Sequence, residues 1–402
     1  MTNLPQGWKM ETLGEILSSD KYSIKRGPFG SALKKSFFVE KGIRIFEQYN
    51  PINNDPHWKR YFISHEKFQE LEAFKATEGD LLISCSGTLG KIVELPKDTE
   101  MGIINQALLK IRLNNIKILN SYFIYYFNSP IMQEKILEST LGSAIKNIAS
   151  VKILKQIEIP LPPLKEQERI VGILDESFAK IDESIKILEQ DLLNLDELMQ
   201  SALQKAFNPL KDNAKENYKL PQSWEWKSLE EISENISAGG DKPKNCTESK
   251  TAKNQIPVYA NGVNNNGLVG YTDKATIIKP SLTISARGTI GFVCIRKEPY
   301  FPIVRLISLI PCENILCLHY LYFCLNFFIA KGEGSSIPQL TIPKFKSLQI
   351  PLPPLKEQEQ IAKHLDFVFE KTKALKELYT KELKDYEELK QSLLDKAFKG
   401  EL

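Results

Sequence analysis

The sequence predicts an α+β fold made of two tandem modules, each a compact α/β domain followed by one long helix. Three observations predict this fold: an identical ten-residue repeat, several weaker paired motifs around it, and a heptad pattern after each copy. A chain of 402 residues has room for two or three domains with sizeable cores. We expect the two helices to pair as an antiparallel coiled coil that separates the two domains, with a pseudo-two-fold axis relating the modules.

The repeat defines the module boundaries. The residues Ile-Pro-Leu-Pro-Pro-Leu-Lys-Glu-Gln-Glu occupy 159–168 and recur unchanged at 350–359. Further pairs are Pro5–Trp8 with Pro221–Trp224, Ile83–Gly90 with Ile284–Gly291, Tyr122–Asn128 with Tyr320–Asn326, and the Lys-Ala-Phe endings at 205–207 and 396–398. The chain is therefore a tandem duplication. We divide it into a first domain (1–158), a hinge and helix (159–210), a second domain (211–349) and a second hinge and helix (350–402).

The domain part of each module mixes short β-branched runs with Gly and Asn turns, which indicates a sheet-containing fold. Val258–Tyr271, with its two Asn-Gly pairs, is the clearest turn-rich β segment. In each hinge the Pro-Pro pair predicts the end of an extended strand and the entry to a helix, since proline suits the first turn of a helix but not its interior.

Each hinge leads into a heptad pattern. The expected core positions are Leu174, Phe178, Ile181, Ile185, Leu188, Leu192, Leu195 and Met199 in the first helix, and Leu365, Val368, Leu375, Tyr379, Leu383, Tyr386, Leu389 and Leu393 in the second. The second pattern is less regular, which predicts a local change in supercoil. About 43 residues at ~1.5 Å each predict a rod of roughly 65 Å. The alternative is two separate stalks that engage other proteins.

The net charge of +3 hides an uneven distribution. Residues 164–207 hold 5 basic and 10 acidic side chains, and 355–402 hold 10 and 11, so the rest of the chain carries 38 basic and 29 acidic ones. The domains are therefore mildly basic and the helices acidic. This distribution excludes a polycation that binds any nucleic acid through charge alone, but it permits DNA recognition.

Several protein classes are disfavoured. Residues 1–8 have no apolar signal-peptide core, the apolar run 315–330 is too short to span a bilayer, and six cysteines without a CxxC pair suggest reduced thiols, so we expect a cytoplasmic protein without membrane contact. A zinc site could be imagined from Cys312, Cys317, His319 and Cys324. Their spacing fits no usual zinc pattern, so core packing is the favoured interpretation and no metal is expected.

No motif predicts catalysis. The segment Gly87–Lys91 resembles part of a phosphate-binding loop, but Ile92 stands where Ser or Thr would meet magnesium, and a strand–turn–strand is the better interpretation. The sequence has no dinucleotide fingerprint, His-Glu-x-x-His helix, Gly-x-Ser-x-Gly elbow or Asn-Pro-Pro-Tyr tetrad. Its four histidines do not occupy equivalent places in the two modules. We therefore assign no catalytic residue.

With its duplicated hinges, long helices and Pro-x-x-Trp starts, the chain resembles the specificity subunit of Type I restriction–modification systems. The resemblance covers essentially the whole chain and implies a target recognition domain and a spacer helix, each present twice. It implies a non-catalytic subunit whose two domains each read half of a bipartite site in double-stranded DNA. The helices would set the gap and dock two methylation subunits, which use S-adenosylmethionine. Restriction (motor-nuclease) subunits would use ATP and Mg, so no cofactor is expected in this chain.

Residues that contact DNA are expected among polar and basic loop residues, because Lys and Arg suit phosphates while Arg, Asn and Gln suit base edges. In the first domain the candidates are Lys25, Arg26, Ser31, Lys34, Lys35, Asn53, Asn54, Lys59, Arg60, Ser86, Thr88, Asn105, Gln106, Ser143, Lys146 and Asn147. In the second they are Lys242, Lys244, Asn261, Asn264, Asn265, Arg287, Thr289, Arg305, Ser335, Ser336 and Gln339. Arg287 is the best base-reading candidate, and an ordinary solvated loop is the alternative for each residue.

The hinge residues Lys165, Glu166, Lys356 and Glu357, with the exposed helix faces, are the candidate docking surface for methylation subunits. Helix-start capping is the alternative for the two glutamates, since acidic groups are favourable near a helix N-terminus. The competing interpretation of the whole chain is a scaffold that does not bind DNA, with two globular interaction heads held on a coiled coil. A nuclease would require metal-dependent cleavage by the isolated chain.

Overall fold

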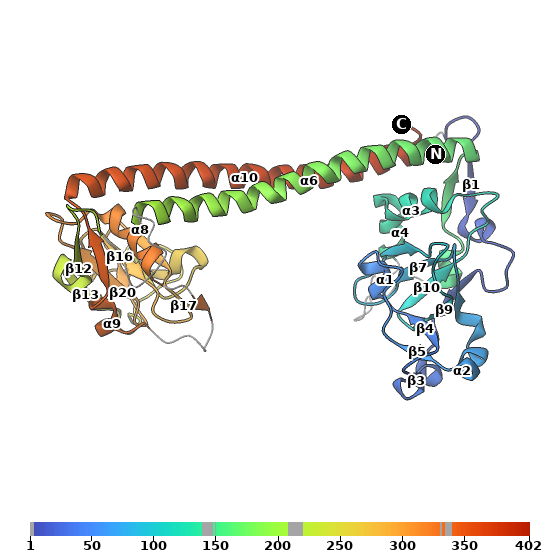
Figure 1. Cartoon of the computed structure of the whole chain (residues 1–402), viewed down its shortest axis with the longest axis horizontal. Helices are drawn as coiled ribbons and strands as arrows, with labels where there is room; N and C mark the ends of the chain where they lie inside the picture. Colours follow the sequence, from blue (N-terminus) through green and yellow to red (C-terminus); the bar gives the residue numbers. More distant parts are fainter. Residues whose placement is uncertain (1–3, 139–147, 149, 208–219, 330–331, 334–339) are drawn as a thin grey trace. The chain divides into compact units, whose positions relative to one another are not determined.

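The structure, a computed structural model, describes residues 4–138, 148, 150–207, 220–329, 332–333 and 340–402. The chain divides into unit 1, which comprises Met1–Ile187 and Lys381–Leu402, and unit 2, which comprises Leu188–Thr380. Each unit therefore contains the start of one long helix and the end of the other. The elements are labelled along the chain in Figure 1.

Unit 1 is built on a four-stranded sheet in the order β2-β10-β7-β8, a five-stranded sheet in the order β3-β5-β4-β9-β6, and the pair β1-β11. Its strands are β1 (Lys9–Thr12), β2 (Ile24–Arg26), β3 (Phe38–Val39), β4 (Ile43–Phe46), β5 (Phe62–Ile63), β6 (Lys75–Ala76), β7 (Leu81–Ser84), β8 (Ile92–Glu94), β9 (Gly102–Ile104), β10 (Leu108–Ile111) and β11 (Glu158–Leu161). Its helices are α1 (Tyr49–Ile52), α2 (His65–Glu70), α3 (Asn120–Asn128), α4 (Pro130–Glu138), α5 (Val151–Leu154) and the start of α6 (Leu164–Phe207), with short 3₁₀ turns η1 (Leu13–Ile16), η2 (Gly30–Ala32), η3 (Lys35–Phe37) and η4 (Glu72–Phe74).

Unit 2 repeats this plan with a four-stranded sheet in the order β13-β20-β16-β18, a three-stranded sheet β15-β14-β19, and the pairs β12-β22 and β17-β21. Its strands are β12 (Glu225–Ser228), β13 (Ser233–Ala238), β14 (Ile256–Tyr259), β15 (Leu268–Thr272), β16 (Ser281–Ile284), β17 (Thr289–Ile290), β18 (Val293–Arg296), β19 (Phe301–Pro302), β20 (Ile307–Pro311), β21 (Gly332–Glu333) and β22 (Gln349–Leu352). Its helices are α7 (Leu229–Ile232), α8 (Leu318–Phe328), α9 (Ile342–Lys346) and the start of α10 (Leu355–Lys399), with η5 (Asn264–Gly267).

The predicted fold class is confirmed, and the two units share one framework. In each unit an aromatic helix, α3 or α8, packs on one face of the four-stranded sheet. The second sheet of each unit contains one parallel pair of strands, β4 with β9 in unit 1 and β14 with β19 in unit 2. Val258–Tyr271, expected as a turn-rich β segment, forms a hairpin of β14 and β15 with a left-handed backbone at Asn265 and Asn266. The sequence motifs that recur therefore mark this framework.

In each module, the strand that follows the Pro-x-x-Trp motif pairs with the strand of the repeated hinge motif. The strand after Pro-x-x-Trp, β1, runs antiparallel to the hinge strand β11, with Lys9 opposite Leu161. In unit 2, β12 pairs with β22 in the same way. As predicted, the Pro-Pro pairs lie between the hinge strand and the long helix, which begins at Leu164 or Leu355.

A completely buried glutamine fixes the first turn of α6 to its own unit. The side chain of Gln167 accepts a hydrogen bond from Leu119 N–H through Oε1 at 2.9 Å. Its Nε2 donates to Lys117 O and to Pro162 O, both at 2.9 Å. The amide therefore uses both of its N–H donors and one of the two lone pairs of its oxygen. These bonds join the helix, the hinge and the segment before α3.

The second copy of the motif makes the same connections. Gln358 is also completely buried; its Oε1 accepts from Cys317 N–H at 2.9 Å. Its Nε2 donates to Ile315 O at 2.9 Å and to Pro353 O at 2.8 Å. Burial of an amide is favourable only when its hydrogen bonds are made, which explains why the motif needs glutamine here.

The Lys-Ala-Phe endings are hydrophobic anchors. Phe207, at the end of α6, is fully buried in unit 2, and its ring lies 5.5 Å from that of Tyr320. Phe398, near the end of α10, is buried in unit 1 against Tyr122 and Tyr126. Each unit thus completes its core with the end of the helix that began in the other.

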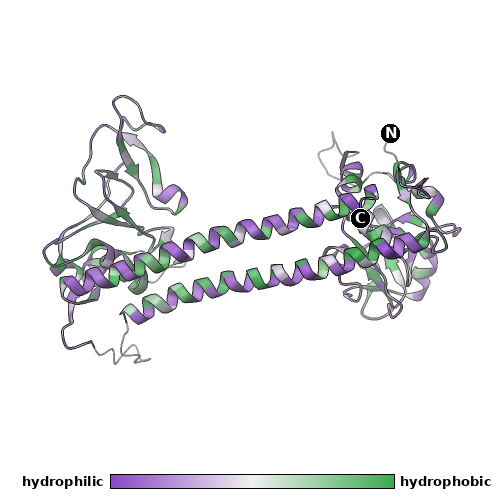
Figure 2. Ribbon diagram, turned by 90° about the horizontal axis from the view of Figure 1, so that it is seen from above, coloured by the Kyte–Doolittle hydropathy of each residue, from purple (hydrophilic) through white to green (hydrophobic). Residues whose placement is uncertain are grey.

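The heptad pattern predicts the core of α6 well and that of α10 in part. Leu174, Ile181, Leu188 and Leu195 are all buried at intervals of seven. In each unit the parts of α6 and α10 that belong to it run antiparallel. In unit 1 Asp182 pairs with Lys390 while Leu174 shares a core with Leu394, and in unit 2 Asp196 pairs with Lys376 while Phe207 shares a core with Leu365. Apolar and polar residues alternate along both helices (Figure 2).

Two predicted core positions of α10 are wrong. Leu375 and Leu389 are 38% and 45% exposed, whereas Thr372 is buried. Each leucine precedes a lysine that reaches toward α6 to make one of the two ion pairs. Because successive residues turn by about 100° around a helix, a lysine directed toward α6 directs the preceding leucine outward.

We expect Gln358→Leu to lower the free energy of unfolding of unit 2 by roughly 2–4 kcal/mol, because three buried backbone groups lose their partner. Urea denaturation followed by tryptophan fluorescence measures this in a background with Trp8→Phe and Trp58→Phe, because the remaining Trp224 and Trp226 both lie in unit 2. Gln360→Leu, an exposed change two residues along the same helix, should shift the curve by less than about 0.5 kcal/mol. Equal shifts for the two variants would contradict the role assigned to Gln358.

Candidate nucleic-acid interface

Four segments of unit 1 meet at one end of its four-stranded sheet. Backbone hydrogen bonds join them, from Gly27 N–H to Leu108 O at 2.9 Å, Asn105 N–H to Phe46 O at 3.0 Å and Cys85 N–H to Ala107 O at 2.8 Å. We call residues 27, 47–48, 85–91 and 105–107 the unit 1 loop cluster. Gly27 is required by this close approach, since an added Cβ would lie 1.8 Å from Asn105 O.

The unit 2 loop cluster, residues 239–240, 260–267, 285–291 and 303–306, has the same framework. Gly239 N–H donates to Leu306 O at 2.8 Å, and Ile303 N–H donates to Tyr259 O at 2.9 Å. These bonds correspond one for one to those made by Gly27 and Asn105. The two clusters are therefore equivalent places in the two modules, although their residues differ.

The Gly-Thr motif forms the same turn in both clusters, between β7 and β8 and after β16. Gly87 and Gly90 have φ of 67° and 69°, and Gly288 and Gly291 have φ of 70° and 81°. A left-handed backbone favours glycine, which explains why both glycines recur. The strand–turn–strand interpretation is confirmed in unit 1, where the turn links β7 to β8.

Some predicted DNA-contacting residues lie in or beside the unit 1 loop cluster, and others do not. The cluster contains Ser86, Thr88, Asn105 and Gln106, and Lys25 and Arg26 lie just before it in β2. Ser31, Lys34 and Lys35 lie on η2, η3 and the link between them, and Asn53, Asn54, Lys59 and Arg60 lie between α1 and β5. Ser143, Lys146 and Asn147 fall outside the described residues.

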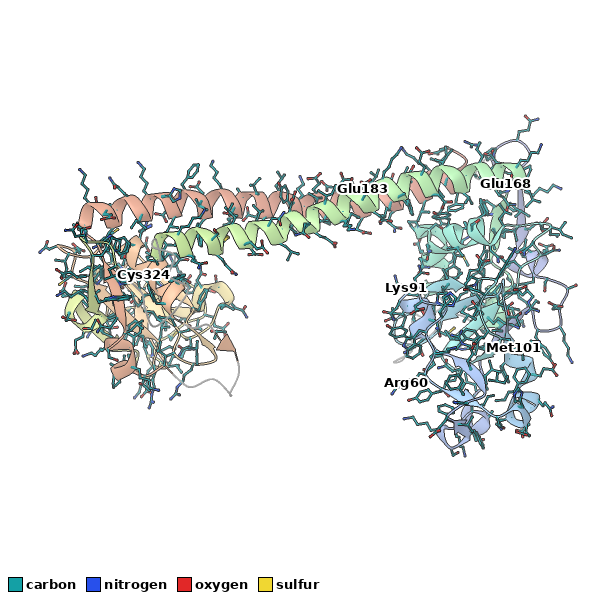
Figure 3. All side chains as sticks on the ribbon, in the orientation of Figure 1. Arg60, Lys91, Met101, Glu168, Glu183 and Cys324 are labelled. Atoms are coloured by element: carbon teal, nitrogen blue, oxygen red, sulfur yellow. The ribbon has the colours of Figure 1, made fainter. Side chains whose placement is uncertain are left out.

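Four of these basic residues have partners within unit 1. Lys25 lies over the rings of Tyr22 and Phe74, and Arg26 lies over that of Phe29. Lys59 pairs with Glu100 at 3.0 Å, and Arg60 stacks over Tyr61 with its guanidinium carbon 4.8 Å from the ring centre. Lys91, at the end of the Gly-Thr turn, was not among the sequence candidates. Lys91 and Arg60 lie along the same edge of unit 1 in Figure 3, with Met101 on the other side.

In unit 2 the predicted residues gather more closely. The loop cluster contains Asn261, Asn264, Asn265, Arg287, Thr289 and Arg305, while Lys242 and Lys244 are exposed in the segment after β13. Ser335, Ser336 and Gln339 fall outside the described residues. The candidates of unit 2 thus largely share one surface, whereas those of unit 1 are spread along the domain.

Asn261 holds its cluster together. Its Oδ1 accepts from Ala286 N–H at 2.8 Å, and its Nδ2 donates to Val304 O at 2.6 Å. Val304 and Arg305 have φ of 53° and 58°, an uncommon conformation that is strained for a β-branched residue. Their backbone N–H groups donate to Gly240 O and Gly239 O, both at 2.8 Å, which stabilises the turn.

Each unit contains a buried arginine that sequence reasoning missed and that holds a loop differing between the two units. Arg296 is 8% exposed, stacks 3.5 Å from the ring centre of Tyr259, and donates to Asn266 O at 2.5 Å and to Thr283 Oγ1 at 3.0 Å. It therefore fixes the tip of the β14–β15 hairpin, residues 264–267. Nothing in the sequence separates this arginine from a surface one.

In unit 1 a different strand supplies the arginine. Arg44 is 3% exposed, stacks over Phe46, the counterpart of Tyr259, and donates to Pro56 O at 2.9 Å and Trp58 O at 2.7 Å. Burial lowers the pKa of Arg44, but a guanidinium remains charged at neutral pH. The two units thus use different residues to hold a loop on an equivalent aromatic side chain.

Burial shifts the pKa of two groups in the unit 1 loop cluster. Burial raises the pKa of Cys85 to about 12, so this thiol stays protonated and is a poor nucleophile. Burial also raises the pKa of Glu47, whose Oε2 has no hydrogen-bond partner among the described residues.

The described residues contain no cluster of three or more His, Cys, Asp or Glu side chains placed to hold a metal ion. Of the four residues considered for zinc, Cys324 is buried in the unit 2 core and His319 pairs with Asp366 at 2.8 Å. In the same described part of the chain, no helix is long and apolar enough to cross a membrane.

The candidate docking residues differ in exposure. Lys165 and Lys356 are exposed, whereas Glu166 and Glu357 are half-buried. Glu166 pairs with Arg169 at 2.8 Å, and Glu357 accepts from Trp224 Nε1 at 3.1 Å. The lysines are thus presented to solvent, while each glutamate makes a contact at the start of its own helix.

Comparison with known proteins gives a consistent result. The family model described as Type I restriction modification DNA specificity domain matches residues 5–192 and 221–385. A putative type I specificity subunit of Mycoplasma pneumoniae is 33% identical over 221 residues, which span 54% of this chain and 56% of that protein. A putative type I restriction enzyme specificity subunit of Methanocaldococcus jannaschii is 25% identical over 362 residues, which span 85% of this chain and 82% of that protein.

Two solved structures have the same fold. A chain from work on complex assembly and conformational transition of the type I R-M system matches with a TM-score of 0.81 at 21% identity, over the full length of both chains. The crystal structure of an HsdS subunit from Thermoanaerobacter tengcongensis matches with a TM-score of 0.64 at 21% identity, over 99% of this chain and 98% of the other.

We expect Arg296→Met to release the hairpin tip, because the charge-assisted hydrogen bond to Asn266 O is lost. Amide hydrogen exchange of peptides covering 260–268 should accelerate roughly 10- to 100-fold, the equivalent of about 1.5–3 kcal/mol. Lys297→Met, a change at the next, exposed residue, should leave that exchange unaltered. Unchanged exchange in Arg296→Met would show that the tip is held by other contacts.

Proposed function

The chain belongs to the Type I restriction modification DNA specificity family, and on that premise we propose that it is the non-catalytic subunit that reads double-stranded DNA for a restriction–modification complex. Each unit reads one half of a bipartite site through its loop cluster. The two halves are separated by a gap that the protein does not read, and the lengths of α6 and α10 set that gap.

One observation carries this proposal: two equivalent loop clusters stand on one conserved framework but present different side chains. The backbone bonds of Gly27 and Gly239 correspond, as do those of Asn105 and Ile303. By contrast, Ser86 in the first turn is replaced by Arg287 in the second. Two readers with the same docking geometry and different base preferences are what a bipartite, non-palindromic site requires.

The charge distribution supports the same division of roles. The acidic helices are unsuited to DNA phosphates, and the basic surplus lies in the domains, where Lys91, Arg60 and Arg287 are exposed. A surplus this small supplies little non-specific affinity, because that affinity grows with the number of phosphates neutralised. Firm binding therefore depends on base contacts and on partner subunits that also contact the duplex.

The helices provide the surface for two methylation subunits. Large apolar side chains remain exposed on both helices, namely Ile187, Leu193 and Leu198 on α6 and Phe367, Leu375, Leu378 and Leu389 on α10. Burial of these side chains against a protein partner would be favourable. Lys165 and Lys356 extend this surface at the hinges. S-adenosylmethionine, ATP and Mg are assigned to the methylation and restriction subunits.

The test is a map of methylated adenines in DNA treated with the complex reconstituted from this chain and its methylation subunits. We expect a bipartite motif. Arg287→Ala should relax one position of one half-site by about 1–3 kcal/mol and leave the other half-site unchanged, because only unit 2 has lost a contact.

Lys279→Ala is the matched control. It removes the same charge, but Lys279 pairs with Glu234 at 2.6 Å and precedes β16, whereas Arg287 follows it. The motif should be unaltered in this variant. A contiguous motif, or loss of both half-sites in Arg287→Ala with the fold intact, would refute the assignment of one half-site to each unit.

A further inference from the structure

A charged cavity of about 350 Å³ lies in unit 1 at the end of the four-stranded sheet opposite to the loop cluster. The cluster follows β2 and precedes β10, whereas the cavity is lined by Lys21 and Tyr22, before β2, and by Lys110 and Arg112, in and after the end of β10. Lys75 and Glu72 contribute from the η4–β6 segment. The cavity is thus separate from the proposed base-reading surface.

Lys110 is the unusual member of this cavity. The residue is only 3% exposed, and its Nζ donates to Lys75 O at 2.7 Å. An ammonium group has three hydrogens to donate, and no other hydrogen bond of this group is present in the described part of the chain. Burial lowers the pKa of Lys110, an effect that Asp80 opposes and Arg112 reinforces.

A second lysine stands directly opposite Lys110. The two residues Lys25 and Lys110 are partners in the register of β2 and β10, a placement that is unfavourable for like charges. Lys25 is directed over the rings of Tyr22 and Phe74, at 5.5 and 5.1 Å. The register of the two strands therefore places like charges close together beside this cavity.

The carboxylates nearby offset only part of this charge, since Asp80 and Asp20 both act to raise the pKa of Lys110. Asp80, which is fully buried, and Asp20 both pair with Arg112, at 2.7 and 2.8 Å. Four cationic side chains, Lys21, Lys75, Lys110 and Arg112, then stand against three carboxylates, Asp20 and Glu72 in the lining and the buried Asp80 behind it. An excess of positive charge remains, and Glu72 is exposed.

The framework does not require this charge. The register places Ser308 at the position of Lys110 in unit 2, and Ser281 at that of Asp80. There, Ser281 Oγ and Tyr300 Oη form a neutral hydrogen bond at 2.9 Å. The same sheet is therefore stable without a buried lysine, and the charged cavity is a property of the first module alone.

We infer that this cavity binds a phosphate group, held by Lys110 at its base and by Lys75 and Lys21 at its rim. Lysine is a common phosphate ligand because its ammonium is a compact charge with several donors. The phosphate has two possible sources. It is either a phosphodiester of the bound duplex, which rests on the proposed function, or a free phosphate monoester or inorganic phosphate.

Binding of inorganic phosphate to the full chain tests the inference, measured by isothermal calorimetry at constant ionic strength against chloride. The key variant is Lys75→Met, because Lys110 uses the Lys75 carbonyl and the substitution keeps that bond. We expect saturable binding to the wild type and at least 10-fold weaker binding to Lys75→Met and to Lys110→Met. Lys91→Met, an exposed lysine in the loop cluster, should bind phosphate like the wild type.

A second measurement identifies the source. With a duplex that carries the methylation motif, the slope of log K against log salt should fall by about 0.9 in Lys75→Met if the cavity holds one DNA phosphate. An unchanged slope with weakened phosphate binding indicates a free phosphate. The inference is overturned if both the slope and the phosphate affinity of Lys75→Met equal those of the wild type. Failure of the proposed function is distinct, because the wild type would then show no motif at all.

Discussion

The structure depends on one buried amide that occurs twice. Gln167 and Gln358 each join the first turn of a long helix to the hinge before it and to the segment that leads into α3 or α8. A helix anchored in this way cannot change its angle to its own domain without leaving three backbone groups unpaired in a dry interior, at a cost of several kcal/mol. The far ends, Phe207 and Phe398, are buried in aromatic cores, so neither end of either helix is loose.

Rigid anchoring explains why the hinge hardly differs between the modules while the loops do. The framework bonds of the loop clusters are made by backbone groups. Apart from the glycines that a close approach or a left-handed backbone requires, the residues of the loops are therefore free to differ. The buried arginines follow the same logic. Arg44 and Arg296 come from different strands, yet each stacks on an equivalent aromatic ring and holds a loop that belongs to its module alone.

The sequence was sufficient to predict the duplication, the hinge, the helices and most core positions of α6, because each is a local pattern with a fixed period. It was insufficient where a single contact across the structure decides the outcome. Leu375 and Leu389 are directed outward because adjacent lysines pair with aspartates on α6, and Arg296 is buried because of a tyrosine in another strand. The repeat in the sequence includes the hinge glutamine, but its anchoring role could be recognised only once the structure placed Leu119 and Cys317 beside it. Which loop residues contact bases stays a prediction.

The central claim is that the two helices set the gap between the two half-sites. It is tested most directly by inserting one heptad into each helix, after Ile187 in α6 and after Thr380 in α10, which preserves their pairing. Adenine methylation mapping of the reconstituted complex should then return both half-sites unchanged. Their gap should lengthen by about three base pairs, since seven helical residues add roughly 10 Å and each base pair spans about 3.4 Å. Intact half-sites with an unaltered gap would contradict the account.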